Sequence, residues 1–311
     1  MNDPNASRAD VLRRLESYYD RAPRPTAHVE QVGPLTLFVS TGEFPYYARP
    51  LLGLARPVSS KDVIDVRRRQ RELGVPEALE WVDETTPSLL PAARAAGLAV
   101  QVCPLLVLDP ARLRDAPDPR IHQVDAGDTD LVLVRAAIDV AFQHEGTDAG
   151  DAGIAARDAH RARHPDLGDS LAARVASGDS VLFGAFDVDD RRERTATPVG
   201  GGSHNPRGQV SEIVGVGVLP AYRRRGLAGA LATALARDAL ARGVATVFCS
   251  AQDEKVASIY LAAGFTRVGT ACIAEPPAAP QGPPPPTPST PTPPSQPPSS
   301  PPPSTTSEAR P

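Results

Sequence analysis

The sequence predicts a mixed α/β (α+β) chain made of two related domains and a disordered tail. Residues 61–98 and 228–265 share the order helix, strand, helix, and each segment ends in a glycine followed by an apolar residue. The predicted elements lack the regular βαβ alternation of a doubly wound sheet. Of the 35 prolines, 17 lie in residues 276–311, which are too poor in apolar residues to fold. We therefore expect domains at 1–109 and 118–275.

The elements of the two domains follow from apolar spacing and from the positions of glycine and proline. In the first domain the repeat predicts a helix at 61–74, a strand at 77–84 and a helix at 89–98. The second domain opens with a strand at 119–124 and a helix whose apolar positions recur at helical spacing from Leu131 to Phe142. The remaining predictions are a helical stretch broken near Pro165, strands at 180–186, 195–201 and 210–218, a hairpin turn at 200–206, a helix at 228–243, a strand at 245–250 and a helix that ends before Gly264.

Composition narrows the class of protein. Charged residues make up 23% of the chain and the formal net charge is −4, so nothing favours a nucleic-acid partner. The cysteines Cys103, Cys249 and Cys272 are odd in number and far apart, which argues against a disulfide framework and a cysteine metal site. No signal peptide or membrane span is evident, so we expect a cytoplasmic protein with no membrane partner.

Residues 210–235, VSEIVGVGVLPAYRRRGLAGALATAL, carry the most specific chemistry. An apolar strand with two glycines, Gly215 and Gly217, leads through a basic loop into a helix. Free N–H groups at the start of a helix lie at the positive end of its dipole and can receive a diphosphate. A surface strand-turn-helix with an arginine patch would account for RRRG alone, but not for the whole ordered pattern.

The segment VGVLPAYRRRGLAGAL resembles the acetyl-CoA signature Q/R-x-x-G-x-G/A of the GNAT superfamily of N-acetyltransferases. Downstream, SAQDEKVASIYLAAGF is similar to the next segment of that family, N-x-x-A-x-x-L-Y-x-x-x-G-F. The resemblance implies a GNAT fold, with a mixed, mostly antiparallel sheet flanked by helices. It also implies acetyl-CoA as the acetyl donor. The spacing of the cysteines and histidines predicts no metal site.

The resemblance also implies which residues bind acetyl-CoA. Backbone groups of the strand would pair with the pantetheine arm, and the loop would hold the pyrophosphate. Asp253 replaces the asparagine of the family and lacks its NH2 donor. The implied cofactor-binding residues are Val216, Gly217, Val218, Arg223, Arg224, Arg225, Gly226, Leu227, Ala228 and Asp253.

Two residues are candidates for proton transfer. Tyr260 falls where the family places a tyrosine that protonates the departing CoA thiolate, although the same helical face could make it a core residue. Glu212 precedes Arg223 by the spacing at which histone acetyltransferases of this superfamily place a glutamate base. Strict alternation would put Glu212 on the same face as Val216 unless a bulge intervenes, and an arginine-paired strand carboxylate is the alternative. His144 and Glu145 are second-rank candidates near the acceptor.

The first domain keeps the elements of the repeat but not the motif, and the position equivalent to Tyr260 is Ala93. It therefore resembles a degenerate GNAT copy, and its segment 43–50 and Trp81 could line the acceptor cleft or pack in the core. We expect an N-acetyltransferase that acts on a primary amine of a small molecule, whose identity stays open. The alternative is a non-catalytic acyl-CoA binding or sensing protein with the proline-rich tail as its partner arm.

Overall fold

The computed structural model describes residues 7–42, 45–114, 117–187 and 196–277. The predicted disordered tail lies outside this part of the chain from residue 278 onward. In the described residues no helix has the length and apolar character needed to cross a membrane.

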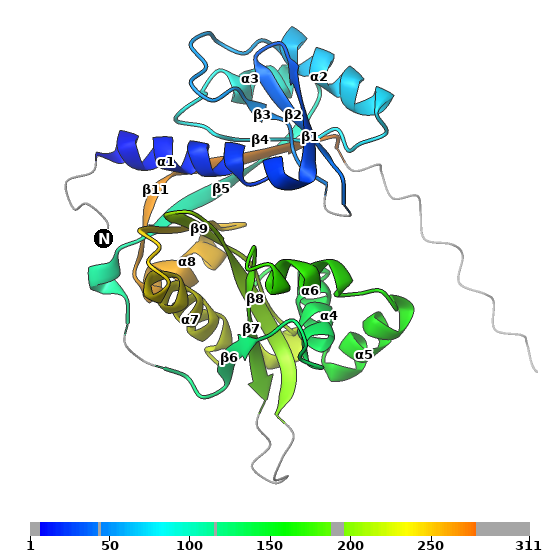
Figure 1. Ribbon diagram of the computed structural model, residues 1–311, viewed down its shortest axis with the longest axis vertical. Coiled ribbons are helices and arrows are strands. Elements are labelled where there is room, and N and C mark those ends of the chain that lie inside the picture. The colour runs from blue at the N-terminus through cyan, green and yellow to red at the C-terminus, as the bar shows by residue number, and fades with distance from the viewer. Residues whose placement is uncertain (1–6, 43–44, 115–116, 188–195, 278–311) are drawn as a thin grey trace, which may run out of the picture. The chain divides into compact units, whose positions relative to one another are not determined.

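The larger sheet of the described residues has eight strands in the order β4-β11-β5-β10-β9-β8-β7-β6 (Figure 1). Only β9 and β10 are parallel, and the other neighbouring pairs are antiparallel. The expected mixed, mostly antiparallel sheet is therefore confirmed. Its strands are β4 (Leu79–Val82), β5 (Ala99–Leu108), β6 (Ile121–Val124), β7 (Val181–Asp187), β8 (Thr197–Arg207), β9 (Val210–Val218), β10 (Thr246–Ser250) and β11 (Phe265–Glu275).

Helices cover both faces of β7, β8 and β9 (Figure 1). One face carries α4 (Leu131–Phe142), against which α5 (Ile154–Arg163) and α6 (Asp169–Ala176) pack. The other face carries α7 (Leu227–Ala241), and α8 (Glu254–Ala263) packs beside α7 against β5 and β11. The apolar stripe predicted for α4 is buried against the sheet except at its end, where Phe142 is 58% exposed.

The N-terminal elements include four that local sequence patterns did not predict. The helix α1 (Arg8–Arg21) begins at Ser7, whose side chain forms a capping box with Asp10. A second sheet contains β1 (Ala27–Val32), β2 (Leu35–Ser40) and β3 (Arg49–Pro50). The predicted repeat follows as α2 (Ser60–Glu72), β4 and α3 (Leu89–Ala95).

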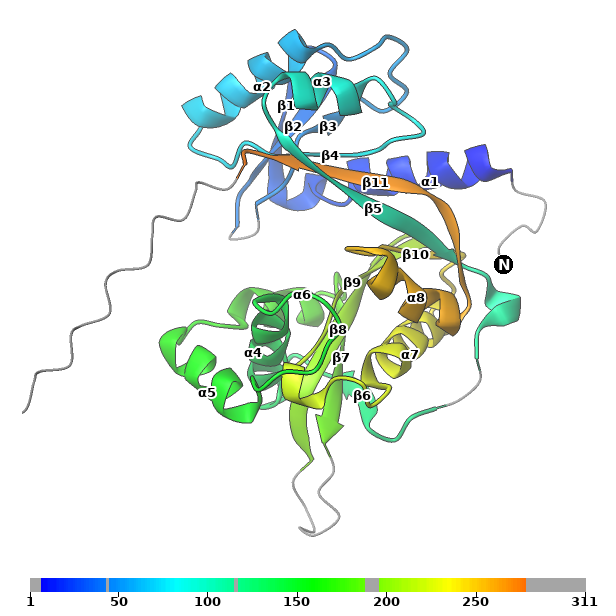
Figure 2. The same ribbon diagram turned by 180° about the vertical axis from the view of Figure 1, so that it is seen from behind.

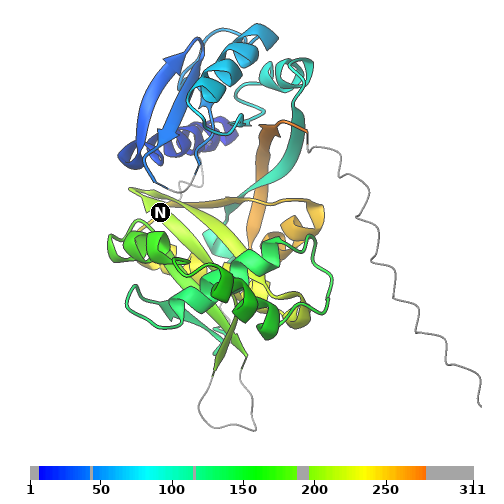
Figure 3. The same cartoon turned by 90° about the vertical axis from the view of Figure 1, so that its right-hand side faces the viewer.

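The two halves of the chain exchange their last strands. The repeat places α2, β4, α3 and β5 in correspondence with α7, β10, α8 and β11. However, β5 pairs with β10, and β11 pairs with β4, while β5 and β11 pair with each other along their length (Figures 2 and 3). Each half therefore completes the sheet of the other, so the N-terminal half supplies a strand beside the site described below.

The glycine run at 200–206 is part of strand β8, and the predicted hairpin turn there is wrong. The turn lies further on, at Gly208, which has a φ of +63°. Glycines are needed in β8 because helices press on both of its faces. A Cβ on Gly201 would overlap a methyl group of Val134 in α4, whereas one on Gly202 would lie 3.2 Å from Leu235 in α7.

Replacing Gly201 with alanine should lower the free energy of unfolding by about 2 kcal/mol, as is usual for an overpacked core. The added Cβ would also lie 2.8 Å from the carbonyl oxygen of Phe183, where backbone cannot easily move aside. Urea unfolding measures the effect. Gly127→Ala is the control, because a Cβ there meets nothing within 4 Å; equal stability of both variants would contradict the prediction.

Candidate functional site

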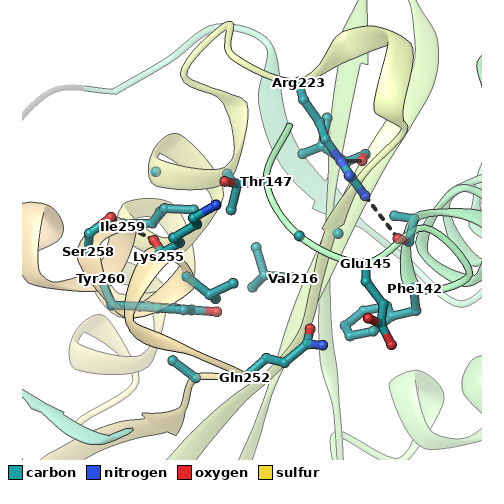
Figure 4. A pocket seen from close by; sticks show the side chains of 18 of the residues that line it. Phe142, Glu145, Thr147, Val216, Arg223, Gln252, Lys255, Ser258, Ile259 and Tyr260 are labelled. Carbon is teal, nitrogen blue, oxygen red and sulfur yellow. Dashed lines mark hydrogen bonds between the residues drawn. The ribbon is translucent and has the colours of Figure 1, made fainter. Parts of the chain in front are cut away.

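The candidate site is a cavity of about 1050 Å³ that opens where β9 and β10 separate. The two strands pair in parallel only from Val210–Thr246 to Glu212–Phe248. Beyond that point the described residues leave the β10-facing edge of β9 unpaired. The segment 141–148, which is the end of α4 and the loop after it, completes the wall together with the start of α7 and with α8 (Figure 4).

A β-bulge in β9 decides which side chains face this cavity. Gly215 has a φ of +65°, and the register between β8 and β9 shifts at this point. As a result Val216 packs with Leu235 on the α7 side, whereas Glu212 lies on the opposite face, next to Tyr19 of α1. The expectation from strict alternation, that Glu212 and Val216 share a face, is wrong because the bulge adds one residue between them.

The strand residues expected to hold a pantetheine arm, Val216, Gly217 and Val218, all line the cavity. Their N–H and C=O groups on the β10 side are not used by the sheet. Gly217 has a second, structural reason to be glycine, since a Cβ there would lie 3.0 Å from the Cβ of Ala141 in α4. The strand edge and the close approach of α4 therefore form one wall.

The loop between β9 and α7 presents a cluster of unbonded N–H groups. Arg224 and Gly226 have φ values of +65° and +81°. Among the described residues, no N–H from Arg224 to Gly229 has a backbone acceptor, and the first that does is that of Ala230, bonded to the Gly226 carbonyl. No side chain caps α7. This arrangement is suited to an anion at the positive end of the helix dipole.

The side chain of Arg223 contacts the neighbouring loop rather than this N–H cluster. Its guanidinium donates to four carbonyl oxygens, those of Val218 (3.1 Å), Ala141 (3.0 Å), His144 (2.7 Å) and Asp148 (3.2 Å) (Figure 4). Arg223 lines the cavity, yet its charge holds the end of β9 to the loop at 141–148. The resemblance predicts that this charge faces phosphate.

The other basic and small residues of the motif differ in position. Leu227 and Ala228 line the cavity at the start of α7, as does Arg224. Arg225 does not line the cavity, and its guanidinium lies over the ring of Tyr222, 4.8 Å from the centroid. The contribution of Arg225 to phosphate binding stays a prediction.

Asp253 caps α8, and its Oδ1 accepts a hydrogen bond from the N–H of Val256 at 2.8 Å. It does not line the cavity, so its carboxylate is used by the helix. Its neighbours Gln252 and Lys255 do line the cavity. Lys255 is one of only two lysines in the chain, and this rarity was the one sequence signal that could have identified it.

Tyr260 points from α8 into the cavity, and its hydroxyl lies between Val216 and Gln252 (Figure 4). The side chain is 6% exposed and packs edge-on against Phe265. The described residues give its hydroxyl no hydrogen-bond partner. Burial, and then the nearby Cys249, raise the pKa of Tyr260 well above its usual value, so the phenol keeps its proton.

Glu212 lies beside the cavity rather than in its wall, whose nearest members on β9 are Ile213 and Val214. Its Oε1 accepts a hydrogen bond from the Tyr19 hydroxyl at 3.4 Å. Burial, and then the Glu80 carboxylate, raise the pKa of Glu212 to about 8, against the opposing effects of Arg49 and Tyr19. Any proton it takes from the cavity must arrive through water.

The rest of the cavity wall combines the predicted loop with residues from the exchanged strands. His144 and Glu145, named from the sequence, line the cavity. Gln101 and Cys103 from β5 and Ile273 from β11 also line it. No local signal marks these three residues, because their position depends on pairing between strands that are far apart in sequence.

Other polar and sulfur-containing candidates have structural surroundings. His160 is 6% exposed, with Nε2 3.3 Å from Asp139 Oδ2, so it is held within the packing of α4 and α5. The described residues contain no group of three or more His, Cys, Asp or Glu side chains that could hold a metal ion. Trp81 and all three cysteines are buried, the cysteines as free thiols.

Comparisons with known proteins agree with this architecture. Residues 154–265 match the model of the Acetyltransferase (GNAT) family. A GCN5-related N-acetyltransferase from Kribbella flavida is 18% identical, with a TM-score of 0.62 over 86% of this chain and 96% of that chain. A functionally unknown conserved protein from Staphylococcus epidermidis is 15% identical, with a TM-score of 0.50 over 83% of this chain and 96% of that chain. No curated protein matches this chain.

The fold is therefore a GNAT fold. The family match covers β9, the loop after it, α7 and α8, which form most of the cavity wall. It leaves the acceptor unidentified.

Proposed function

We propose that the protein is an N-acetyltransferase that moves an acetyl group directly from acetyl-CoA to a primary amine of a small molecule. The observation that carries this proposal is the continuous wall formed by the free edge of β9 and the unbonded N–H groups from Arg224 to Gly229. An extended polar arm that ends in a diphosphate matches both parts of this wall. Acetyl-CoA has that shape.

Binding follows from the geometry of this wall. The amide groups of the pantetheine arm would pair with Val216, Gly217 and Val218 as an added strand would. The pyrophosphate would lie on the N–H groups at the start of α7. Arg224 and Lys255 are the cavity-lining cations that support phosphate binding, because the Arg223 guanidinium is bonded to carbonyl groups.

The transfer itself needs three proton movements. The amine nitrogen attacks the thioester carbonyl carbon, the C–S bond breaks, and the CoA thiolate takes the phenolic proton of Tyr260. The proton that the nitrogen loses as the amide forms returns through water to the Tyr260 phenolate. The amine arrives as ammonium and must first lose a proton, which Glu212 accepts through water. Fixing the thioester and the amine in one cavity supplies much of the acceleration through orientation.

The N-terminal half is, in this proposal, a degenerate GNAT-like copy that binds no acetyl-CoA. The helix α2, which corresponds to α7, begins with a capping box in which Ser59 and Asp62 satisfy N–H groups that α7 leaves free. The position of Tyr260 is taken by Ala93, which is fully buried. The copy therefore lacks both the phosphate cradle and the acid, although its strand β5 lines the site.

The proposal is tested by calorimetry with CoA and by release of free CoA thiol from acetyl-CoA in the presence of a broad panel of amines. Binding with amine-dependent release supports it. Binding without release from any amine would favour a non-catalytic acyl-CoA binding protein, and absence of binding would contradict both.

Tyr260→Phe should lower kcat at least about tenfold, a loss of roughly 1.4 kcal/mol of barrier stabilisation, because only the proton donor is removed. The ring keeps its edge-on contact with Phe265, so CoA affinity should change little. Steady-state kinetics and calorimetry measure the two effects. An unchanged kcat under conditions where chemistry limits the rate would rule out the role as acid.

A further inference from the structure

Glu212 is held by residues of the N-terminal half of the chain. The Tyr19 hydroxyl in α1 donates to Glu212 Oε1 at 3.4 Å. The ring of Tyr19 is covered by the guanidinium of Arg49, with Cζ 3.9 Å from the ring centroid. Arg49 in turn pairs through Nη1 with the Glu80 carboxylate of β4. A chain of contacts therefore links β9 to β3 and β4.

Arg49 has more hydrogen-bond donors than its single ion pair uses. The residue is 5% exposed, and its Nη2 is buried with no hydrogen-bond partner among the described residues. An unpaired buried donor is costly, so it favours a second negative charge nearby. Glu212 is close enough for its charge and that of Arg49 to affect each other. The charge of one guanidinium thus acts on two carboxyl groups, those of Glu80 and Glu212.

We propose that Tyr19, Arg49 and Glu80 are positioning residues that hold the Glu212 carboxyl group beside the cavity and control whether it carries a proton. The N-terminal half then contributes to the transfer site through these side chains as well as through β5. This inference rests on the acetyl transfer proposed above, but the contacts can be tested without it.

The groups that face Glu212 predict opposite effects on its pKa. Glu80 repels the ionised form and raises the pKa, whereas Arg49 and the Tyr19 hydroxyl favour the ionised form and lower it. Tyr18 of α1 and Cys249 of β10 also interact with it, but both are neutral because burial raises their own pKa values. Glu212 gains its base form as pH rises through about 8.

The test compares Glu80→Gln and Tyr19→Phe, which preserve side-chain shape, with Glu77→Gln. Glu77 is a suitable control because it also pairs with arginines of the N-terminal half, Arg67 and Arg71, but does not act on Glu212. The first readout is the carboxyl titration of Glu212 by ¹³C NMR, with its signal identified from Glu212→Gln. The second is the pH profile of kcat/KM for CoA release.

We expect Glu80→Gln to lower the pKa of Glu212 by at least about one pH unit, which is a tenfold change in proton affinity. Tyr19→Phe should raise that pKa. The pH profile should shift in the same two directions, and Glu77→Gln should leave both unchanged. If Glu212 titrates in Glu80→Gln and Tyr19→Phe as it does in Glu77→Gln, the proposed contacts are wrong. If the Glu212 titration shifts but the pH profile of kcat/KM does not, Tyr19 and Glu80 have no role in the transfer. If no amine supports CoA release, the proposed function fails and the titration alone decides the contacts.

Discussion

Gly226→Val is expected to weaken CoA binding at least about 100-fold, or roughly 2.7 kcal/mol. Gly226 has a φ of +81° at the N-terminus of α7, a conformation that a β-branched residue adopts only with strain. A Cβ there meets no protein atom within 4 Å. The valine methyl groups would therefore enter the open space above the free N–H groups, where the pyrophosphate is proposed to lie. Calorimetry with CoA measures the loss.

Gly243→Val is a matched control at the other end of the same helix. Gly243 also has a φ of +81°, and a Cβ there also meets nothing within 4 Å. The two variants should lose similar stability, about 1–2 kcal/mol from the left-handed backbone, but only Gly226→Val should lose CoA affinity. If both bind CoA as the unchanged protein does, the phosphates do not lie at α7.

The parts of the site that the sequence predicts are those encoded within one continuous segment. Residues 210–235 form the predicted strand, loop and helix, and Tyr260 lies in the cavity in register with Gly264. In these segments the periodic apolar residues, the glycines and the first residues of the helix are close together in the sequence. Local pattern and tertiary structure agree there because the same residues determine both.

What could not be predicted depends on contacts between distant segments. The pairing of β5 with β10 and of β11 with β4 leaves no mark in either strand, so the contribution of Gln101 to the cavity was not foreseen. The loop contains three consecutive arginines that the sequence alone does not distinguish. Arg223 binds carbonyl groups, Arg224 lines the cavity and Arg225 stacks on Tyr222. Their neighbours, not their motif, decide their roles.

Arg223→Met is expected to lower the free energy of unfolding by about 3 kcal/mol and kcat/KM at least about 30-fold. Hydrogen bonds from a charged donor contribute roughly 1.5–3 kcal/mol each, and solvent access to this partly exposed side chain reduces the sum. Methionine keeps much of the length but leaves the carbonyl groups of Val218, Ala141 and His144 without their donor. The loop at 141–148 would then separate from β9, and the acceptor wall would lose its position.

Arg225→Met separates this effect from a general loss of positive charge in the loop. Arg225 makes a ring contact with Tyr222 and lies 3.5 Å from the half-exposed Asp187, interactions that together contribute about 1 kcal/mol. Urea unfolding and steady-state kinetics of both variants should therefore show a large effect only for Arg223→Met, with KM for the amine rising more than KM for acetyl-CoA. If the two variants instead lose equal CoA affinity and equal stability, Arg223 acts as one more phosphate cation and its clamp on the loop contributes little. Arg223 would then have the phosphate-binding role that the motif predicts. A purely electrostatic contribution of this kind does not depend on which carbonyl groups the guanidinium contacts.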